Sequence, residues 1–211
     1  MDENTPQDRT RRRFLQAMAA VPLVLAAPKL LDLARGPDEP GTMVLAPTPA
    51  CDDDDDDDPT PAQTEGPFFT PRSPQRTSLI ESGVAGTRLM LTGVVFTRSC
   101  RPVANALIDF WQTDADGEYD NRGYRLRGHQ FTDEHGIYRL ETIVPGLYPG
   151  RTRHIHVKVQ APERPILTTQ LYFPEESRNA RDRIFHPDLV MRTESAGSGI
   201  AGHFNFVLDL A

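Results

Sequence analysis

Short segments in which hydrophobic and polar residues alternate recur along the chain from about Gln63 onward. Turn-forming pairs separate them, such as Asp-Gly at 116–117 and Pro-Gly at 145–146 and 149–150. Alternation with a period of two is typical of half-buried β-strands, and turns at this spacing are typical of an antiparallel sandwich or barrel. The predicted strands are TRLMLTGVVFT (87–97), NALIDFWQTD (105–114), GIYRLETI (136–143), HIHVKVQAP (154–162), LTTQLYF (167–173) and GHFNFVLDL (202–210).

This pattern predicts an all-β fold, with an antiparallel β-sandwich core and long loops that carry the functional site. The segment PEESRNARDRIFHPDL (174–189) has few strand signals and is expected to form a short helix or a long loop. The loops 70–85 and 174–200 are the expected place for substrate selection. Residues 63–211 are therefore interpreted as one β-sandwich domain.

The N-terminus has a different pattern. Arg11–Arg13 precede a short apolar run from about Ala17 to Ala27, as in a signal peptide, and the run is shorter than a transmembrane helix requires. The Arg-Arg-x-Phe-Leu core resembles a twin-arginine export signal. Residues 1–34 are thus predicted to engage the twin-arginine export machinery, which would deliver the protein to the periplasm or the exterior.

Residues 35–62 are rich in Pro and Asp and are predicted to form a disordered linker. The run Asp52–Asp58 accounts for the net charge of −7, because the other residues balance. No basic stripe suggests a nucleic-acid partner. The two cysteines, Cys51 and Cys100, are interpreted as separate thiols, although export would permit a disulfide.

Candidate metal ligands occur in the segment YPGRTRHIHVKV (148–159). His154 and His156 lie two residues apart, so both side chains point to the same face of the predicted strand. No Asp, Glu or Cys adjoins the pair to complete a zinc-type site, but Tyr148 lies six residues before it and Tyr119 lies in a preceding turn. Phenolate is a hard anionic donor, so two tyrosines and two histidines indicate a trivalent ion such as Fe³⁺.

Four segments together resemble the intradiol ring-cleaving dioxygenases, which include the protocatechuate- and catechol-cleaving enzymes. The segments are TEGPFF (64–69), DFWQTDADGEYDNRG (109–123), TDEHGIYRLETIVPGLYPGRTRHIHVKV (132–159) and TTQLYF (168–173). The resemblance covers most of the chain from Gln63 onward. It implies a β-sandwich and a non-haem Fe(III) centre that cleaves a catechol-type diol with O₂ to a cis,cis-muconate-type dicarboxylate.

The resemblance also assigns residues. The positions that match the family's iron ligands are Tyr119, Tyr148, His154 and His156. The matching active-site arginine is Arg151, which would stabilise developing negative charge, and the matching glutamine is Gln170, which would orient the substrate. Tyr148 is also implied to leave the metal and accept a proton from the substrate.

Two assignments have competitors within the sequence. Tyr124 lies near Tyr119, although the turn ADGEY favours Tyr119. Arg153 competes with Arg151; strict alternation places Arg153 opposite the histidines, whereas Arg151 follows a Pro-Gly pair and its direction is free. The other histidines, at 129, 135, 186 and 203, are interpreted as surface or structural residues.

Two other classes of function compete with the dioxygenase. A non-catalytic, exported transthyretin-like binding module would explain the strands and turns, but not the grouping of Arg151, the two histidines and Gln170. A zinc hydrolase built on the histidine pair lacks an evident carboxylate base. Metal analysis separates the three, since they predict iron, no stoichiometric metal, and zinc.

Overall fold

The computed structural model of the chain describes residues 58–211. The predicted export signal, Cys51 and most of the predicted linker lie outside the described residues, so what was inferred about them stays a prediction. Among residues 58–211, no helix is both long enough and apolar enough to cross a membrane.

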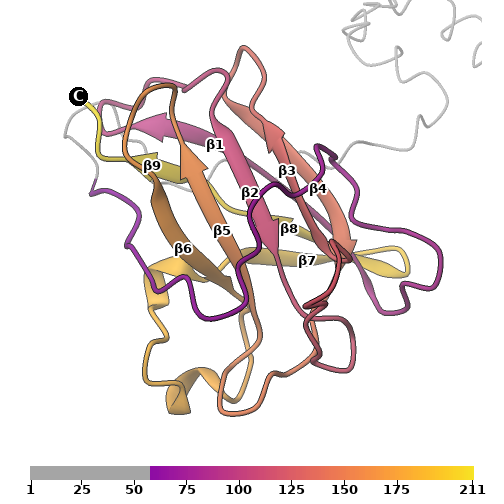
Figure 1. Cartoon of the computed structure of the whole chain (residues 1–211). Helices are drawn as coiled ribbons and strands as arrows, with labels where there is room; N and C mark the ends of the chain where they lie inside the picture. The colour runs from indigo at the N-terminus through magenta and orange to yellow at the C-terminus, as the bar shows by residue number, and fades with distance from the viewer. Residues whose placement is uncertain (1–57) are drawn as a thin grey trace, which may run out of the picture. The chain divides into compact units, whose positions relative to one another are not determined.

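The described residues form two β-sheets that pack face to face (Figure 1), which confirms the predicted all-β sandwich. The first sheet has the order β4-β1-β8-β7, and β9 also pairs with β1. Its strands are β1 (Arg88–Thr97), β4 (Ile137–Ile143), β7 (Arg192–Ala196), β8 (Gly199–His203) and β9 (Phe206–Leu208). The second sheet has the order β3-β2-β5-β6. Its strands are β2 (Leu107–Trp111), β3 (Arg127–Phe131), β5 (His154–Gln160) and β6 (Leu167–Tyr172).

The second sheet is antiparallel throughout, whereas β1 pairs parallel with both β8 and β9. These parallel partners come from the C-terminal end of the chain. No tight turn connects them to β1, so the antiparallel direction that a hairpin imposes does not apply. Between β6 and β7 the chain forms a long loop with two 3₁₀ turns, η1 (Asn179–Arg181) and η2 (Pro187–Leu189). This agrees with the predicted long loop or short helix.

Strand β5 shows how the sandwich separates its core from its outer face. Ile155, Val157 and Val159 point inward and are fully buried in the hydrophobic core. His154 and His156 point to the opposite face of the same strand and are nevertheless buried, because other parts of the chain cover that face. The strand therefore presents two histidines in a sheltered position outside the core.

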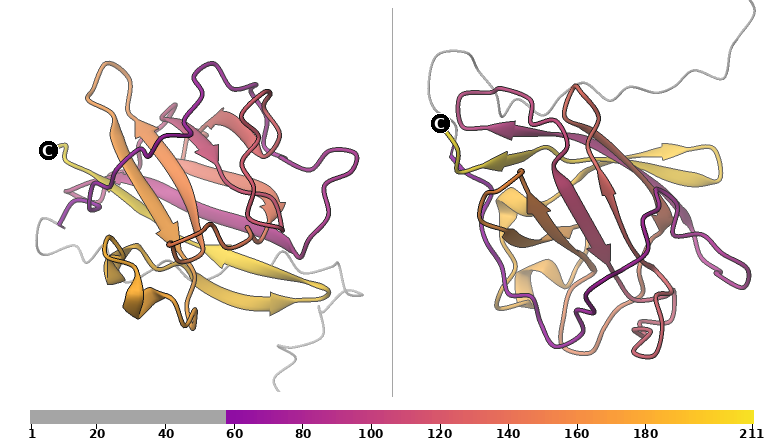
Figure 2. Two further views of the ribbon diagram at one scale, coloured as in Figure 1. Left: turned by 60° about the horizontal axis from the view of Figure 1, so that its bottom comes forward. Right: turned by 45° about the horizontal axis from the view of Figure 1, so that its top comes forward.

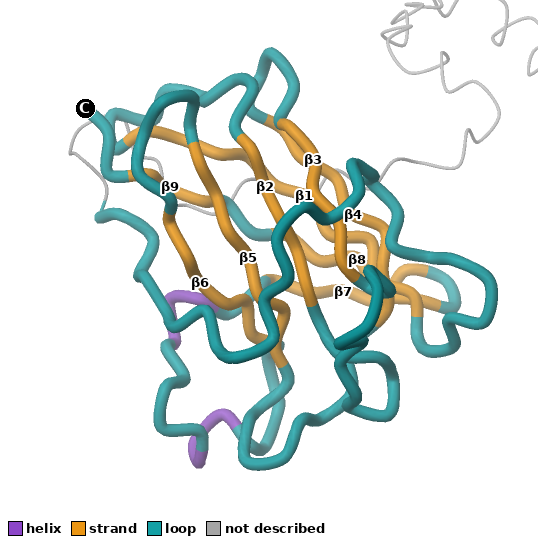
Figure 3. The backbone as a smooth tube through the Cα atoms, viewed as in Figure 1, coloured by secondary structure: helices purple, strands orange, loops and turns teal. Residues whose placement is uncertain are grey.

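The cover comes from the segment that precedes β1, which crosses the outer face of the second sheet in both the ribbon and the tube views (Figures 1 and 3). Gln63 N–H donates to Thr168 O at 2.8 Å. The predicted linker reaches residue 62, but Thr60 is already buried and its N–H donates to Val207 O at 2.9 Å. The linker boundary is thus too late by a few residues, because Thr60 supplies both a backbone and a hydroxyl partner for Val207.

Three loops gather at one end of the second sheet, as Figures 1 and 2 show. They are the β2–β3 loop (112–126), the β4–β5 loop (144–153) and the β6–β7 loop (173–191). This end of the sheet lies where β5 begins, at His154. The loops therefore meet beside the two histidines.

Candidate metal centre and active site

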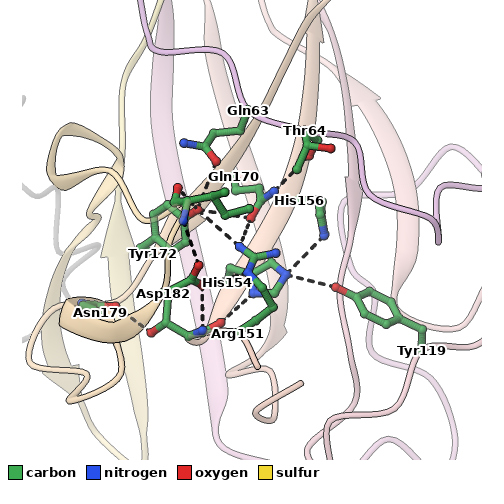
Figure 4. A network of polar contacts seen from close by, with 12 residues as sticks. Gln63, Thr64, Tyr119, Arg151, His154, His156, Gln170, Tyr172, Asn179 and Asp182 are labelled. Atoms are coloured by element: carbon green, nitrogen blue, oxygen red, sulfur yellow. Dashed lines mark hydrogen bonds and ion pairs between the residues drawn. The ribbon is translucent and has the colours of Figure 1, made fainter. Parts of the chain in front are cut away.

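Three predicted ligands converge on one point (Figure 4). His154 Nε2 lies 3.2 Å from His156 Nε2, and Tyr119 Oη lies 3.2 Å from the same His154 nitrogen. The histidines come from one face of β5, and the tyrosine comes from the β2–β3 loop. Residues 35 positions apart in the sequence thus present their polar atoms to each other.

Tyr148, the fourth predicted ligand, lies beside Tyr119. Their rings pack edge to face at 5.7 Å between centroids, and Phe68 packs against both. The two loops that carry these tyrosines touch through glycines. A Cβ on Gly146 would lie 2.2 Å from the backbone nitrogen of Gly117, so a side chain there would separate the loops.

The electrostatics favour neutral imidazoles at this point. Burial, and after it the Arg151 cation, lower the pKa of His154 to about 4. Burial, followed by the neighbouring His154 and Arg151, holds the pKa of His156 well below its usual range. His154 Nδ1–H donates to Thr152 O at 2.7 Å, which leaves the lone pair of Nε2 directed at the site.

Burial raises the pKa of Tyr119, although the cations Arg151 and Arg127 oppose this shift. Without a metal ion, the phenol therefore keeps its proton and donates a hydrogen bond to His154 Nε2. A cation at this point can displace that proton, because the phenolate then becomes its ligand.

The donor set fits a single metal ion. Two nitrogen ligands at about 2.1 Å from one ion, at right angles, lie roughly 3 Å apart, close to the separation of the histidines. Within residues 58–211, no group of three or more His, Cys, Asp or Glu side chains is arranged to hold a metal. A metal held by this histidine pair therefore needs tyrosine oxygens, which favour Fe(III) over zinc.

Arg151 and Gln170 are also brought to the site. Arg151 Nη2 donates to Gln170 Oε1 at 2.6 Å, and Arg151 Nε donates to Asp182 Oδ2 at 2.8 Å. Gln170 is fully buried on β6, opposite His156 in the antiparallel register, and its Nε2 donates to Thr64 O. The cation is thus held next to the histidine pair.

The two competing residues have partners elsewhere. Tyr124 Oη donates to Pro71 O at 3.0 Å on an exposed surface. Arg153 pairs with Glu176 at 3.2 Å and also donates to Pro145 O. Neither contacts the histidine pair, so the geometry favours Tyr119 as the metal ligand and Arg151 as the active-site arginine.

The loop 70–85 was expected to take part in substrate selection. Its Arg76 side chain donates to the backbone oxygen of Arg127.

Several residues at the site were not identified from the sequence. Trp111 stacks on His156 at 4.8 Å, and Phe68 stacks on Tyr119 at 4.6 Å. Arg127 is only 1% exposed and donates to Phe68 O and Asp120 O. Phe68 and Trp111 lie in the segments that carry the family resemblance, but only the folded chain shows what they contact. Asp182 and Tyr172, which both contact the Arg151 guanidinium, were also not identified from the sequence.

A β-sandwich that directs two histidines and a tyrosine to one sheltered point, with a second tyrosine and a fixed arginine beside them, defines a candidate non-haem metalloenzyme. A protein-family model described as Dioxygenase matches residues 64–209. The chain therefore belongs to this dioxygenase family, which argues against the transthyretin-like binding module.

Individual proteins agree with the family. The protocatechuate 3,4-dioxygenase beta chain of Burkholderia cepacia is 34% identical over 118 residues, which is 47% of this chain and 50% of that protein. The hydroxyquinol 1,2-dioxygenase of Nocardioides simplex is 30% identical over 150 residues, which is 60% of this chain and 51% of that protein. The chain spans about half the length of these curated relatives.

Solved structures share the fold. The dioxygenase domain of a dioxygenase carbohydrate-binding protein fusion from Streptomyces sp. SirexAA-E is 60% identical, with a TM-score of 0.72 over 73% of this chain and 100% of that one. The 3-chlorocatechol 1,2-dioxygenase of Rhodococcus opacus 1CP is 27% identical, with a TM-score of 0.67 over 72% of this chain and 74% of that one.

Proposed function

We propose that this protein is a non-haem Fe(III)-dependent intradiol dioxygenase. It would cleave a catechol-type aromatic diol between its two hydroxyl-bearing carbons and form a cis,cis-muconate-type dicarboxylate. The observation that carries the proposal is that Tyr119 Oη and His156 Nε2 each lie 3.2 Å from His154 Nε2, with the Tyr148 ring packed beside Tyr119. Family membership and the names of the relatives support the same reaction class.

The proposed ligands are Tyr119, Tyr148, His154 and His156. Fe(III), when bound, supplies the Lewis acidity that acidifies the diol and the electronic coupling between its ring and O₂. The two neutral imidazoles and two phenolates leave one positive charge on the centre, which suits an anionic diol. Tyr148 Oη is the group we propose to accept a proton from a substrate hydroxyl.

Arg151 is the residue that we propose to stabilise negative charge during the reaction. Its guanidinium is fixed before substrate arrives, since Gln170 and Asp182 accept hydrogen bonds from two of its nitrogens. A preorganised cation in a sheltered site stabilises negative charge as it develops on the reacting oxygen atoms. Trp111 and Phe68 stack on His156 and Tyr119 and keep water from these ligands.

Oxygen uptake with a panel of catechols tests the proposal. The iron-loaded protein is expected to consume O₂ and diol in equal amounts, with both oxygen atoms recovered in a dicarboxylate. A yellow semialdehyde, formed by cleavage next to the diol, would contradict the intradiol assignment. No oxygen uptake with any catechol, by a protein that has bound iron stoichiometrically, would contradict the enzyme assignment.

We also propose that the protein is exported by the twin-arginine route. The support is the sequence of residues 1–34, in which Arg11 and Arg12 match the paired arginines of such signals. Replacing both with Lys keeps the charge but removes the planar guanidinium that a receptor can recognise. The double variant is expected to remain in the cytoplasm in a fractionation experiment; normal export would overturn this route without affecting the proposed chemistry.

A further inference from the structure

Asp182 lies in the β6–β7 loop, yet its carboxylate is bonded to the start of β5. Its side chain is only 2% exposed. Oδ2 accepts hydrogen bonds from Arg151 Nε at 2.8 Å and from Thr152 N–H at 2.9 Å, and Oδ1 accepts from Ile184 N–H at 3.1 Å. Three donors from two segments thus fix the plane of this carboxylate.

The same carboxylate fixes the guanidinium of Arg151. Asp182 holds Nε and Gln170 holds Nη2, so two anchors at different nitrogens define both the plane and the rotation of a rigid planar group (Figure 4). Within residues 58–211, Nη1 has no hydrogen-bond acceptor. One nitrogen of this preoriented cation, whose side chain is 19% exposed, therefore remains available for an oxygen atom of a ligand.

We propose that Asp182 is the positioning residue for Arg151. This inference rests on the proposed function, because it assigns Arg151 its orientation in that reaction. Without Asp182, the guanidinium would be held only at Nη2, by Gln170 and by a longer contact of 3.5 Å with Tyr172 Oη. Bonds at one nitrogen leave the rest of the group free to turn about that nitrogen. The loop 173–191 thereby takes part in the active site through a residue that does not contact the substrate.

The alternative is that Asp182 serves only to anchor the β6–β7 loop. Other bonds already do so: Thr152 Oγ1 donates to Asn179 Oδ1 at 2.7 Å, and Tyr172 Oη donates to Ile184 O at 3.1 Å. Loss of the carboxylate therefore leaves the loop attached at two points. The positioning role and the anchoring role predict different results when Arg151 is also removed.

The same loop supplies a matched control. Glu176 pairs with Arg153 at 3.2 Å, and its side chain is 15% exposed. This pair joins the same loop to the same end of β5 with the same pair of charges. It does not involve Arg151, so Glu176→Ala removes a comparable anchor without disturbing the proposed catalytic cation.

The first experiment is steady-state oxygen uptake by the iron-loaded full chain with catechol. Asp182→Ala is expected to lower kcat by about tenfold or more, part of the 10² to 10³ typical for loss of a preorganised group, with KM and iron content within about twofold. Asp182→Asn retains an acceptor oxygen and is expected to lose less. Glu176→Ala is expected to match the unmodified protein.

A double-variant cycle separates the two roles. If Asp182 acts through Arg151, then Asp182→Ala has no further effect on kcat in an Arg151→Ala background. A further loss comparable to that of the single variant would show an independent, structural contribution and would overturn the proposal. A fall in kcat with Glu176→Ala equal to that with Asp182→Ala would overturn it as well.

A crystal structure of the Asp182→Ala variant tests the inference without relying on turnover. The guanidinium of Arg151 is expected to leave Gln170 or to become disordered, while His154, His156 and Tyr119 keep their positions. An Arg151 side chain unchanged in the variant would overturn the positioning role, whatever the kinetics. If the unmodified protein cleaves no catechol, the proposed function fails, but this structure still decides whether Asp182 orients Arg151.

Discussion

Arg151 and Arg153 are two positions apart and have different partners. Arg151 precedes β5, so strand alternation does not fix its direction, and its side chain reaches Gln170 and Asp182. Arg153 instead bonds to Glu176 and Pro145. At the scale of single residues, the partners of a charge therefore decide which arginine can serve the site.

This difference predicts the outcome of two substitutions. Arg151→Ala is expected to lower kcat by roughly 10² to 10³, on the order of 3 kcal/mol in the activation free energy, while iron content stays constant. The reason is that a charge-stabilising donor is lost but no proposed ligand is touched. Arg153→Ala is the control and is expected to stay near the unmodified rate. The reverse pattern would show that the two arginines are wrongly assigned.

Asp182 links stability to pH. Burial raises its pKa, but hydrogen bonds from Thr152 N–H, Ile184 N–H and Arg151 outweigh burial, and the net pKa is below its ordinary value. A carboxyl with a depressed folded pKa adds stability above its unfolded pKa of about 3.9, and this stability is lost as pH falls through the folded pKa.

The expected difference in unfolding free energy between the metal-free protein and its Asp182→Asn variant is therefore larger at about pH 7 than at about pH 2. Urea unfolding at both pH values measures it. The free energy of the unmodified protein alone is not informative, because other carboxyls titrate too. A difference that does not change with pH would contradict the depressed pKa.

At the scale of elements, alternation predicted the strands that carry a core face. In β5 every second residue is a buried apolar side chain, and in β1 and β4 most of the alternate residues are, so alternation makes these strands visible. Strand β3 was not predicted, because its sequence RGHQF buries Arg127 and Gln130 instead of apolar residues. The exposed strand β7, RTESA, lacks an apolar face altogether.

Strand β1 has no room for a side chain at Gly93, which can be tested by substitution. A Cβ on Gly93 would lie 1.7 Å from Phe204 O, a backbone atom that cannot rotate away. Gly93→Ala is thus expected to cost at least about 2–3 kcal/mol in unfolding free energy, the upper range for overpacking. Chemical denaturation measures this cost.

Gly202→Ala in the adjacent β8 provides the comparison. The nearest atom to its new Cβ is Leu89 Cδ1 at 3.2 Å, the end of a side chain that can adjust. The cost there is expected to be clearly smaller. Equal effects of the two substitutions would mean that the close approach of β1 to Phe204 is relieved by other movements.

At the scale of the whole molecule, the site arises where the covered outer face of one sheet meets three loops. The four proposed ligands, Arg151 and Gln170 were identified from the sequence because they lie in short segments with a family resemblance. Asp182 lies 31 residues from Arg151, in a loop whose sequence shows no periodicity. Only the folded chain brings it to the guanidinium, so no local pattern could predict it.

Two tyrosines that share a ferric ion with two histidines are the centre of the proposed function, and the visible spectrum of the iron-loaded protein tests this ligand set most directly. Phenolate bound to Fe(III) absorbs visible light by charge transfer, whereas zinc, with a full d shell, does not. We expect a red to purple protein with a high-spin ferric EPR signal, and a band that shifts when catechol is added without oxygen.

Tyr119→Phe and Tyr148→Phe are each expected to change this band, whereas Tyr124→Phe, whose hydroxyl bonds to Pro71 O, leaves it as it is. His154→Ala and His156→Ala are expected to lower iron content. A colourless protein that holds one zinc ion, or that binds no metal after reconstitution with iron, would contradict the account.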